Sequence, residues 1–153
     1  MRIRRAPLYL LWLSSLLLAA APAAPPVPTV DALLGAQRVR IPLAVLADRA
    51  PLAAGEDFRV VELGRDASTS HHVVAIRTAE TPHRHDRHDL LVMVVRGYGS
   101  MRIGDATLPV GEGSLLYVPR GAVHAFTNES GAPSVAYAIY TPPFDGADRV
   151  EVR

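Results

Sequence analysis

The sequence of 153 residues contains no cysteine and no lysine, and aromatic residues make up only 6% of it. Without cysteine the chain has no disulfide, no thiolate metal ligand, no cysteine nucleophile and no lipidated cysteine. Its stability must therefore come from packing, and any metal ion must be bound by histidine or oxygen ligands.

The sequence also lacks an apolar run long enough for a membrane span. Its longest one is an eleven-residue block at 8–18, which follows a basic start and precedes small residues that end at Ala23. A membrane-spanning helix needs roughly 20 apolar residues, whereas a basic start, a short apolar block and small residues are typical of a secretory signal peptide. We therefore expect residues 1–23 to be a signal peptide, the mature protein to be periplasmic or secreted, and the chain to have no stable membrane anchor.

The net charge of the sequence is small as well. The whole chain has a formal charge of +1, and removal of Arg2, Arg4 and Arg5 with the signal peptide leaves 13 arginines against 15 acidic residues, a charge of −2. Such a balance argues against a surface that binds polyanions, so we expect no nucleic-acid partner. The remaining length, about 130 residues, suits one domain with one core.

The remaining chain divides into two parts that differ in amino-acid composition and residue pattern. Residues 24–57 are rich in alanine and proline and read as an N-terminal arm, in which 30–34 and 43–49 each form a short helix or an extended segment. From Phe58 onward, β-type runs alternate with turns rich in glycine and proline. We expect seven strands, at 58–63, 72–77, 90–95, 100–103, 115–118, 123–127 and 135–140. This pattern predicts an all-β sandwich or barrel.

The run Leu90–Val95 is apolar at every position, so both of its faces should be covered. One face should line the core. The other should pack on a second sheet, on the N-terminal arm or on a partner subunit, and the last option would make the protein a homodimer.

Histidines are the most informative residues of the sequence. His83 and His85 stand two apart, a spacing that places both imidazoles on the same face of a strand. His88 follows within the same polar segment, and His124 opens a separate strand. A metal site of these residues needs two strands brought together by closure of the sheet.

The segment around His124 resembles the second motif of the cupin family: a glycine, five residues, proline, one residue, glycine, two residues, histidine, three residues and asparagine. The five fixed positions are matched by Gly113, Pro119, Gly121, His124 and Asn128. Glycine and proline are uncommon enough that a chance match of all five in a chain of this size is about one in ten thousand or less.

The first cupin motif is matched in part. Its histidine pair resembles His83 and His85, and its closing glycine resembles Gly97. The glutamate of the pattern falls on Leu90, and the nearest carboxylate, Asp89, is one residue away, which on a strand means the opposite face. His88 shares the parity of Leu90.

The resemblance implies a jelly-roll barrel, also called a double-stranded β-helix, over residues 58–144, with 145–153 as a C-terminal tail. It also implies a metal site inside the barrel. We expect His83, His85 and His124 to be ligands, with His88 as the fourth ligand and Asp89 as the alternative. Such a set suits one divalent transition metal ion, Fe, Ni, Cu or Zn.

Two functions from different classes fit this sequence. The first is an exported small cupin that acts on or senses a small molecule at its metal and, if it is an enzyme, is a metal-dependent oxidoreductase (for example a dioxygenase), isomerase or lyase. The second is a non-catalytic cupin that binds a small ligand and whose metal site is degenerate or absent. Candidates for proton handling and for anion binding, by residue type alone, are Tyr98, Tyr117, Tyr137 and Tyr140, and Arg84, Arg87 and Arg102.

Overall fold

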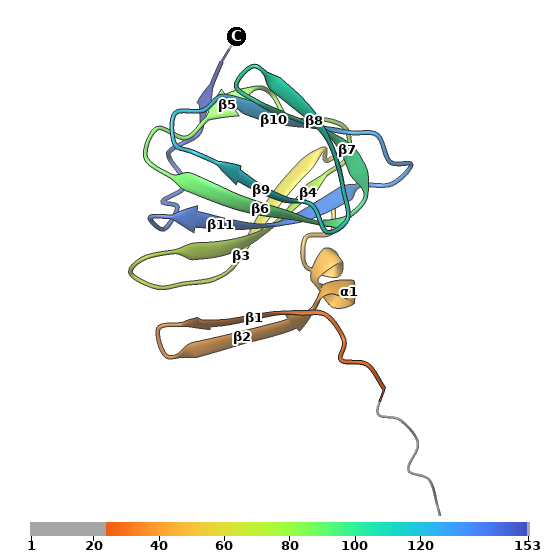
Figure 1. Ribbon diagram of the computed structural model, residues 1–153, viewed down its shortest axis with the longest axis vertical. Helices are drawn as coiled ribbons and strands as arrows, with labels where there is room; N and C mark the ends of the chain where they lie inside the picture. Colours follow the sequence, from red (N-terminus) through yellow and green to blue (C-terminus); the bar gives the residue numbers. More distant parts are fainter. Residues whose placement is uncertain (1–23, 153) are drawn as a thin grey trace, which may run out of the picture.

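The computed structural model describes residues 24–152, and the expected signal peptide lies outside this range. Two five-stranded sheets face each other to form a barrel (Figure 1). One, here called the β10 sheet, has the order β12 (Val150–Glu151), β5 (His83–Arg84), β10 (His124–Asn128), β7 (Tyr98–Ile103) and β8 (Ala106–Gly111). The other, the β11 sheet, has the order β3 (Phe58–Arg65), β4 (Ser70–Ile76), β11 (Ser134–Thr141), β6 (Asp89–Arg96) and β9 (Leu115–Val118).

All the named strand pairs are antiparallel. Each of the seven expected strands overlaps a strand of the structure. The all-β expectation is therefore confirmed. The sequence reading missed β8, because a strand that contains Pro109 looks interrupted. This strand lies at the edge of its sheet and pairs only with β7, a position where a missing backbone N–H costs no ladder bond.

The N-terminal arm is a β-hairpin followed by a short helical segment. Strands β1 (Thr29–Leu34) and β2 (Gln37–Pro42) pair across a turn at Gly35, whose φ of 60° favours glycine. Residues 30–34 are thus extended and not helical. Helix α1 (Leu43–Leu46) and the 3₁₀ helix η1 (Ala47–Arg49) follow, as one reading of 43–49 predicted. No helix in residues 24–152 has the length and apolar character needed to cross a membrane.

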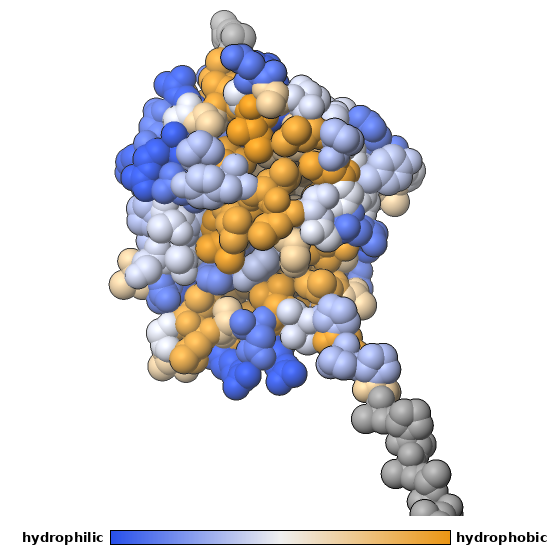
Figure 2. Space-filling model, in the orientation of Figure 1, coloured by the Kyte–Doolittle hydropathy of each residue, from blue (hydrophilic) through white to orange (hydrophobic). Residues whose placement is uncertain are grey.

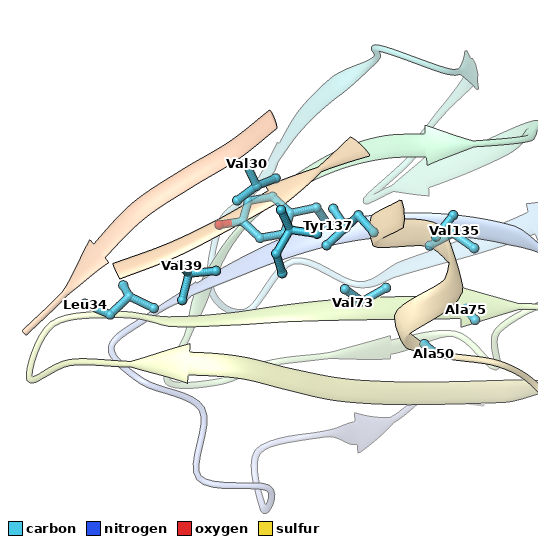
Figure 3. Close-up of a cluster of buried hydrophobic side chains, with 11 residues drawn as sticks. Val30, Leu34, Val39, Ala50, Val73, Ala75, Val135 and Tyr137 are labelled. Carbon is cyan, nitrogen blue, oxygen red and sulfur yellow. The ribbon is translucent and has the colours of Figure 1, made fainter. Parts of the chain in front are cut away.

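The arm packs on the outer face of the β11 sheet, beneath the barrel in the view of Figure 1. Figure 3 shows Val30, Leu34 and Val39 of the hairpin directed at Tyr137 and Val73 of the sheet. Figure 2 shows that hydrophobic residues also lie on the outer surface of both the barrel and the arm on this face. Burial of apolar side chains between the β11 sheet and the arm supplies a second apolar cluster outside the barrel.

Strand β6 shows how the apolar run is used. Leu90 and Val94 point into the barrel, whereas Met93 and Val95 pack against the cluster under the arm. Of the three coverings expected for the second face, the structure shows the N-terminal arm. Leu91, at the end of this face, remains 37% exposed. The homodimer stays a prediction.

Candidate metal centre

Three of the expected ligands meet inside the barrel. His83 in β5 and His124 at the start of β10 are direct partners across the antiparallel ladder, and His85 follows β5 by one residue. One ring nitrogen from each lies within 4.8 Å of the other two, and all three side chains are buried. The ring centroids of His83 and His124 are 4.2 Å apart, and those of His85 and His124 are 5.4 Å apart.

Two backbone features of the second motif bring these histidines together. Gly121 has a φ of 78°, which an L side chain rarely adopts, and so allows the chain to turn from Pro119 into β10. The N–H of Gly121 also donates to the carbonyl of His85 at 2.7 Å. The turn before His124 is therefore bonded directly to the segment that carries His85.

All three histidines have the same tautomer. The Nδ1 atoms of His83 and His124 lie 2.9 Å and 3.0 Å from the carbonyl oxygens of Thr81 and Ala122, and Nδ1 of His85 contacts the carbonyl of Asp148. A carbonyl only accepts hydrogen bonds, so each Nδ1 must carry the proton. Each Nε2 then keeps a lone pair, and that of His85 is buried without a hydrogen-bond partner.

Arg149 approaches the same nitrogen of His83, with Nη2 at 3.3 Å from Nδ1 and at 3.5 Å from the carbonyl of Thr81. The shorter contact between His83 and Thr81 fixes the proton on Nδ1. The guanidinium therefore shares the carbonyl of Thr81 with the imidazole and does not donate to the ring.

Burial keeps these imidazoles neutral. It lowers the pKa of His83 to about 3 and that of His124 to about 4, and the nearby imidazoles and Arg149 act in the same direction. The pKa of His85 is also lowered, chiefly by burial. A neutral imidazole is the metal-binding form.

The donor set fits a transition metal ion. Three neutral imidazoles each place one ring nitrogen within 4.8 Å of the other two. Each ring is also oriented by a hydrogen bond from Nδ1 to a carbonyl, as is usual for ligating histidines. The unpartnered Nε2 of His85 is a buried polar atom that a metal ion would satisfy. Nitrogen donors of this kind suit Zn, Fe, Cu and Ni.

His88 is not part of this group, contrary to our expectation of a fourth ligand. Its Nδ1 lies 2.5 Å from a carboxylate oxygen of Asp148, and its Nε2 lies 3.2 Å from the carbonyl of Pro143. Both nitrogens contact oxygen atoms of the C-terminal segment, and His88 is not among the histidines whose ring nitrogens lie within 4.8 Å of one another. No pattern in the sequence indicated Asp148, which is 60 residues away from His88.

Asp89, the alternative fourth ligand, is also engaged elsewhere. Its carboxylate pairs with Arg120 at 2.6 Å, and the hydrogen bonds from Arg120 lower its pKa to about 2. Leu90 occupies the position of the family's glutamate, is buried and lines the cavity beside the three histidines. The ligands that the described residues bring together are therefore three imidazoles without a carboxylate.

The histidines line one side of a cavity of about 200 Å³ inside the barrel. The rest of its wall is mostly apolar and comes from both sheets, with Phe58, Val94, Met101 and Phe126 among its residues. An apolar cavity of about 150 Å³ holds a benzene molecule, so this one has room for a small organic molecule next to the histidines.

Four further polar side chains line the cavity, Glu80, Ser134, Tyr140 and Arg149, and sequence reasoning singled out only Tyr140. Glu80 precedes His83 and is the one carboxyl group among the described lining residues; burial raises its pKa to about 7. Burial also raises the pKa of the Tyr140 phenol well above its usual range. The Nε of Arg149 is buried without a hydrogen-bond partner.

The other tyrosines and arginines considered by residue type have different roles. Tyr98 and Tyr117 are exposed, and Tyr137 belongs to the cluster under the arm. The three arginines are bonded to nearby oxygens: Arg84 to Asp86, Arg87 to Asp145 and Arg102 to the carbonyl of Gly104. None of them lines the cavity.

Comparison with known proteins agrees with this architecture. Residues 70–140 match the family model described as a cupin domain. An uncharacterized protein of Aquifex aeolicus (strain VF5) is 37% identical over 97 residues, which are 63% of this chain and 79% of that protein. The chain belongs to the cupin superfamily.

Solved structures show the same fold at lower identity. A Klebsiella pneumoniae protein with a double-stranded β-helix domain superposes with a TM-score of 0.60 at 14% identity, over 71% of this chain and 94% of that one. The Streptomyces protein Pac13, described as a nucleoside dehydratase, gives 0.56 at 19% identity, over 70% and 88%. KdgF from Halomonas gives 0.56 at 18% identity, over 61% and 86%.

Proposed function

We propose that the protein binds one divalent transition metal ion, Fe, Ni, Cu or Zn, through His83, His85 and His124, and that it acts on a small molecule held in the barrel cavity. The observation that carries this proposal is the shared tautomer. Three buried imidazoles each donate Nδ1–H to a carbonyl, and one ring nitrogen of each lies within 4.8 Å of the other two.

The lining of the cavity suits a small and largely apolar substrate that carries an oxygen-containing group. A metal ion at this position supplies a Lewis acid that polarises a substrate oxygen. The apolar wall excludes water and holds the carbon skeleton. Arg149 places a positive charge beside the histidines, which favours a substrate that carries or develops negative charge.

Glu80 is suited to proton transfer in this cavity. A carboxyl group with a pKa of about 7 exchanges its proton near neutral pH. Tyr140 remains protonated and offers a hydrogen-bond donor. Lewis-acid polarisation with proton transfer is sufficient for isomerisation or for elimination, so an isomerase or a lyase is the enzyme class we favour, with a metal-dependent oxidoreductase as the second.

A non-catalytic cupin without metal is the alternative, and Leu90 favours it. This residue puts an apolar side chain where the family pattern has a ligating glutamate. A cavity that lost its metal would still bind a small apolar molecule.

Elemental analysis of the mature protein, purified without a histidine tag, separates these two functions. We expect about one metal ion per chain in the natural protein, near zero in His124→Ala, and about one in His71→Gln, a buried histidine that does not line the cavity. Circular dichroism should show the same strand content in all three. A protein that contains no metal and takes none up on dialysis would contradict the proposal.

We also propose that the protein is exported, on the strength of its first 23 residues. Expression of the full sequence in a bacterium should yield a periplasmic or secreted product that begins close to residue 24. Mass spectrometry of the intact protein measures this directly, and a full-length cytoplasmic product would refute it.

A further inference from the structure

The segment that follows β11 folds back over the mouth of the barrel. Phe144, Gly146 and Arg149 from this segment line the cavity. Between them lies Asp148, an acidic residue that is only 4% exposed. A buried carboxylate is costly unless it is fully hydrogen-bonded, so its partners indicate what it does.

The carboxylate of Asp148 holds the loop between β5 and β6. The backbone N–H of Asp86 donates to Oδ1 at 3.0 Å, and that of Arg87 donates to Oδ2 at 2.8 Å. His88 donates from Nδ1 to Oδ2 at 2.5 Å. The loop held in this way begins immediately after His85.

The backbone carbonyl of Asp148 acts on His85 itself. It accepts the Nδ1–H of the imidazole, while the carbonyl of His85 accepts the N–H of Gly121. Among the three clustered histidines, His85 alone receives its orienting carbonyl from a distant part of the chain. The carbonyls that orient His83 and His124 lie only two residues before each of them.

We propose that Asp148 is the positioning residue of the metal centre. Its carboxylate fixes the loop 86–88, its carbonyl fixes the orientation and tautomer of His85, and His88 is its buried partner. This inference rests on the proposed metal site and assigns to the C-terminal segment a direct part in metal affinity.

Asp148→Asn is the most informative variant. An asparagine keeps the shape but replaces one acceptor oxygen with an NH₂ group, which would face N–H donors. Changes in groups that orient a metal ligand typically cost 10- to 100-fold in metal affinity. We therefore expect the affinity for Co²⁺ to fall about 10- to 100-fold in Asp148→Asn, with an altered visible absorption spectrum of the bound ion.

Asp145→Asn is the matched control, because Asp145 belongs to the same segment but is exposed and, among residues 24–152, pairs with Arg87 and the N–H of Ala147. It should bind Co²⁺ with the affinity of the natural protein. If Asp148→Asn is folded and also binds Co²⁺ with unchanged affinity and spectrum, the inference is wrong.

His88→Gln tests the same contact from its other side. If His88 acts through Asp148, the double variant with Asp148→Asn should be no weaker than the worse single variant, since both remove the same interaction. A loss of binding as complete as that of His124→Ala, without such coupling, would make His88 a ligand and overturn the inference.

The natural protein provides a test that does not depend on the folding of a variant. The ¹⁵N chemical shifts of the metal-free protein report which ring nitrogen of each histidine is protonated. We expect His85 to carry its proton on Nδ1, with a hydrogen-bond coupling to the carbonyl of Asp148. An Nε2–H tautomer would overturn the inference. Because this measurement needs no metal, it stands even if Co²⁺ fails to bind and the proposed function falls.

Discussion

Single residues set the protonation state of the site. His83, His85 and His124 are enclosed by the apolar barrel, and the resulting desolvation penalises their charged forms. The same enclosure also favours the neutral form of Glu80, and for this acid it raises the pKa. The cavity therefore combines uncharged metal ligands with an acid that titrates near neutral pH.

The first consequence concerns the pH dependence of metal affinity. Because the pKa values of His83 and His124 are about 3 and 4, protons do not compete with the metal ion between pH 6 and 8. We expect the affinity for Zn²⁺ to change by less than about threefold over this range. Three ligands with ordinary pKa values near 6.5 would lose well over tenfold.

Competition with a chelator of known affinity at each pH measures this effect. The control is a short peptide with two histidines at the same spacing as His83 and His85, whose affinity should fall steeply at acidic pH. A similar fall in the protein would mean that its imidazoles are solvated and easily protonated.

The second consequence concerns Glu80. Its pKa is about 7 in the folded protein and near 4.5 when exposed, so the unfolded chain binds fewer protons than the folded one between these values. Stability from this group is therefore complete below about pH 4.5 and is lost as the pH rises through 7. Glu80→Gln removes this loss, and we expect it to stabilise the protein relative to the natural one by on the order of 1–3 kcal/mol at pH 8 and little at pH 4.5.

Denaturant unfolding at the two pH values tests this prediction. Glu112→Gln serves as the control, because Glu112 is an exposed turn residue that does not line the cavity. It should show no such pH-dependent gain. Equal stability of Glu80→Gln and the natural protein at pH 8 would contradict the raised pKa.

At the scale of elements, the two sheets have separate tasks. The β10 sheet presents two of the histidines across one ladder, and its strand β5 is only two residues long. The β11 sheet is covered on both faces, by the cavity on one side and by the N-terminal arm on the other. The arm therefore stabilises the wall of the barrel from outside and leaves the site itself untouched.

This division predicts that damage to the arm lowers stability without removing metal. Leu46 of α1 is fully buried in the cluster under the arm. Leu46→Ala should lower the free energy of unfolding by about 2–5 kcal/mol, with about one metal ion per chain retained. The neighbouring Val45 is 46% exposed, and Val45→Ala should change stability by about 0.5 kcal/mol or less. Equal effects of the two changes would mean that the arm does not pack as described.

At the scale of the whole molecule, the N-terminal arm covers the barrel from outside and the segment after β11 adds a strand to one of its sheets. The hairpin β1–β2 covers one sheet from outside, while the segment after β11 crosses to the other side, bonds to the loop 86–88 and ends in β12 beside β5. Metal binding would join β10 to the segment 83–85, because the ligands come from these two. The residues after β11 hold that segment in turn, so the metal site depends on them as well.

Chelation should accordingly destabilise the entire domain. A ligand that binds only the folded state at 100 times its dissociation constant adds about 2.7 kcal/mol, which for a domain of this size corresponds to roughly 10 °C in the unfolding midpoint. We expect calorimetry to show a single transition that moves down by this amount when metal is removed. His124→Ala should show no response to chelator, and an identical midpoint with and without metal in the natural protein would contradict the metal site.

The sequence by itself determined the barrel and the three histidines. Strand alternation and turn glycines are local properties, so they can be read without knowledge of distant contacts, and the resemblance to the two cupin motifs marked His83, His85 and His124 as a set. The same locality explains the error at His88, whose parity and position in a histidine-rich segment resemble those of a ligand. Tertiary structure alone decided its partner, because Asp148 reaches it from a segment 60 residues away. Glu80 and Arg149 likewise become cavity residues only when the sheets close, since burial and charge proximity belong to the folded chain and not to any short stretch of it.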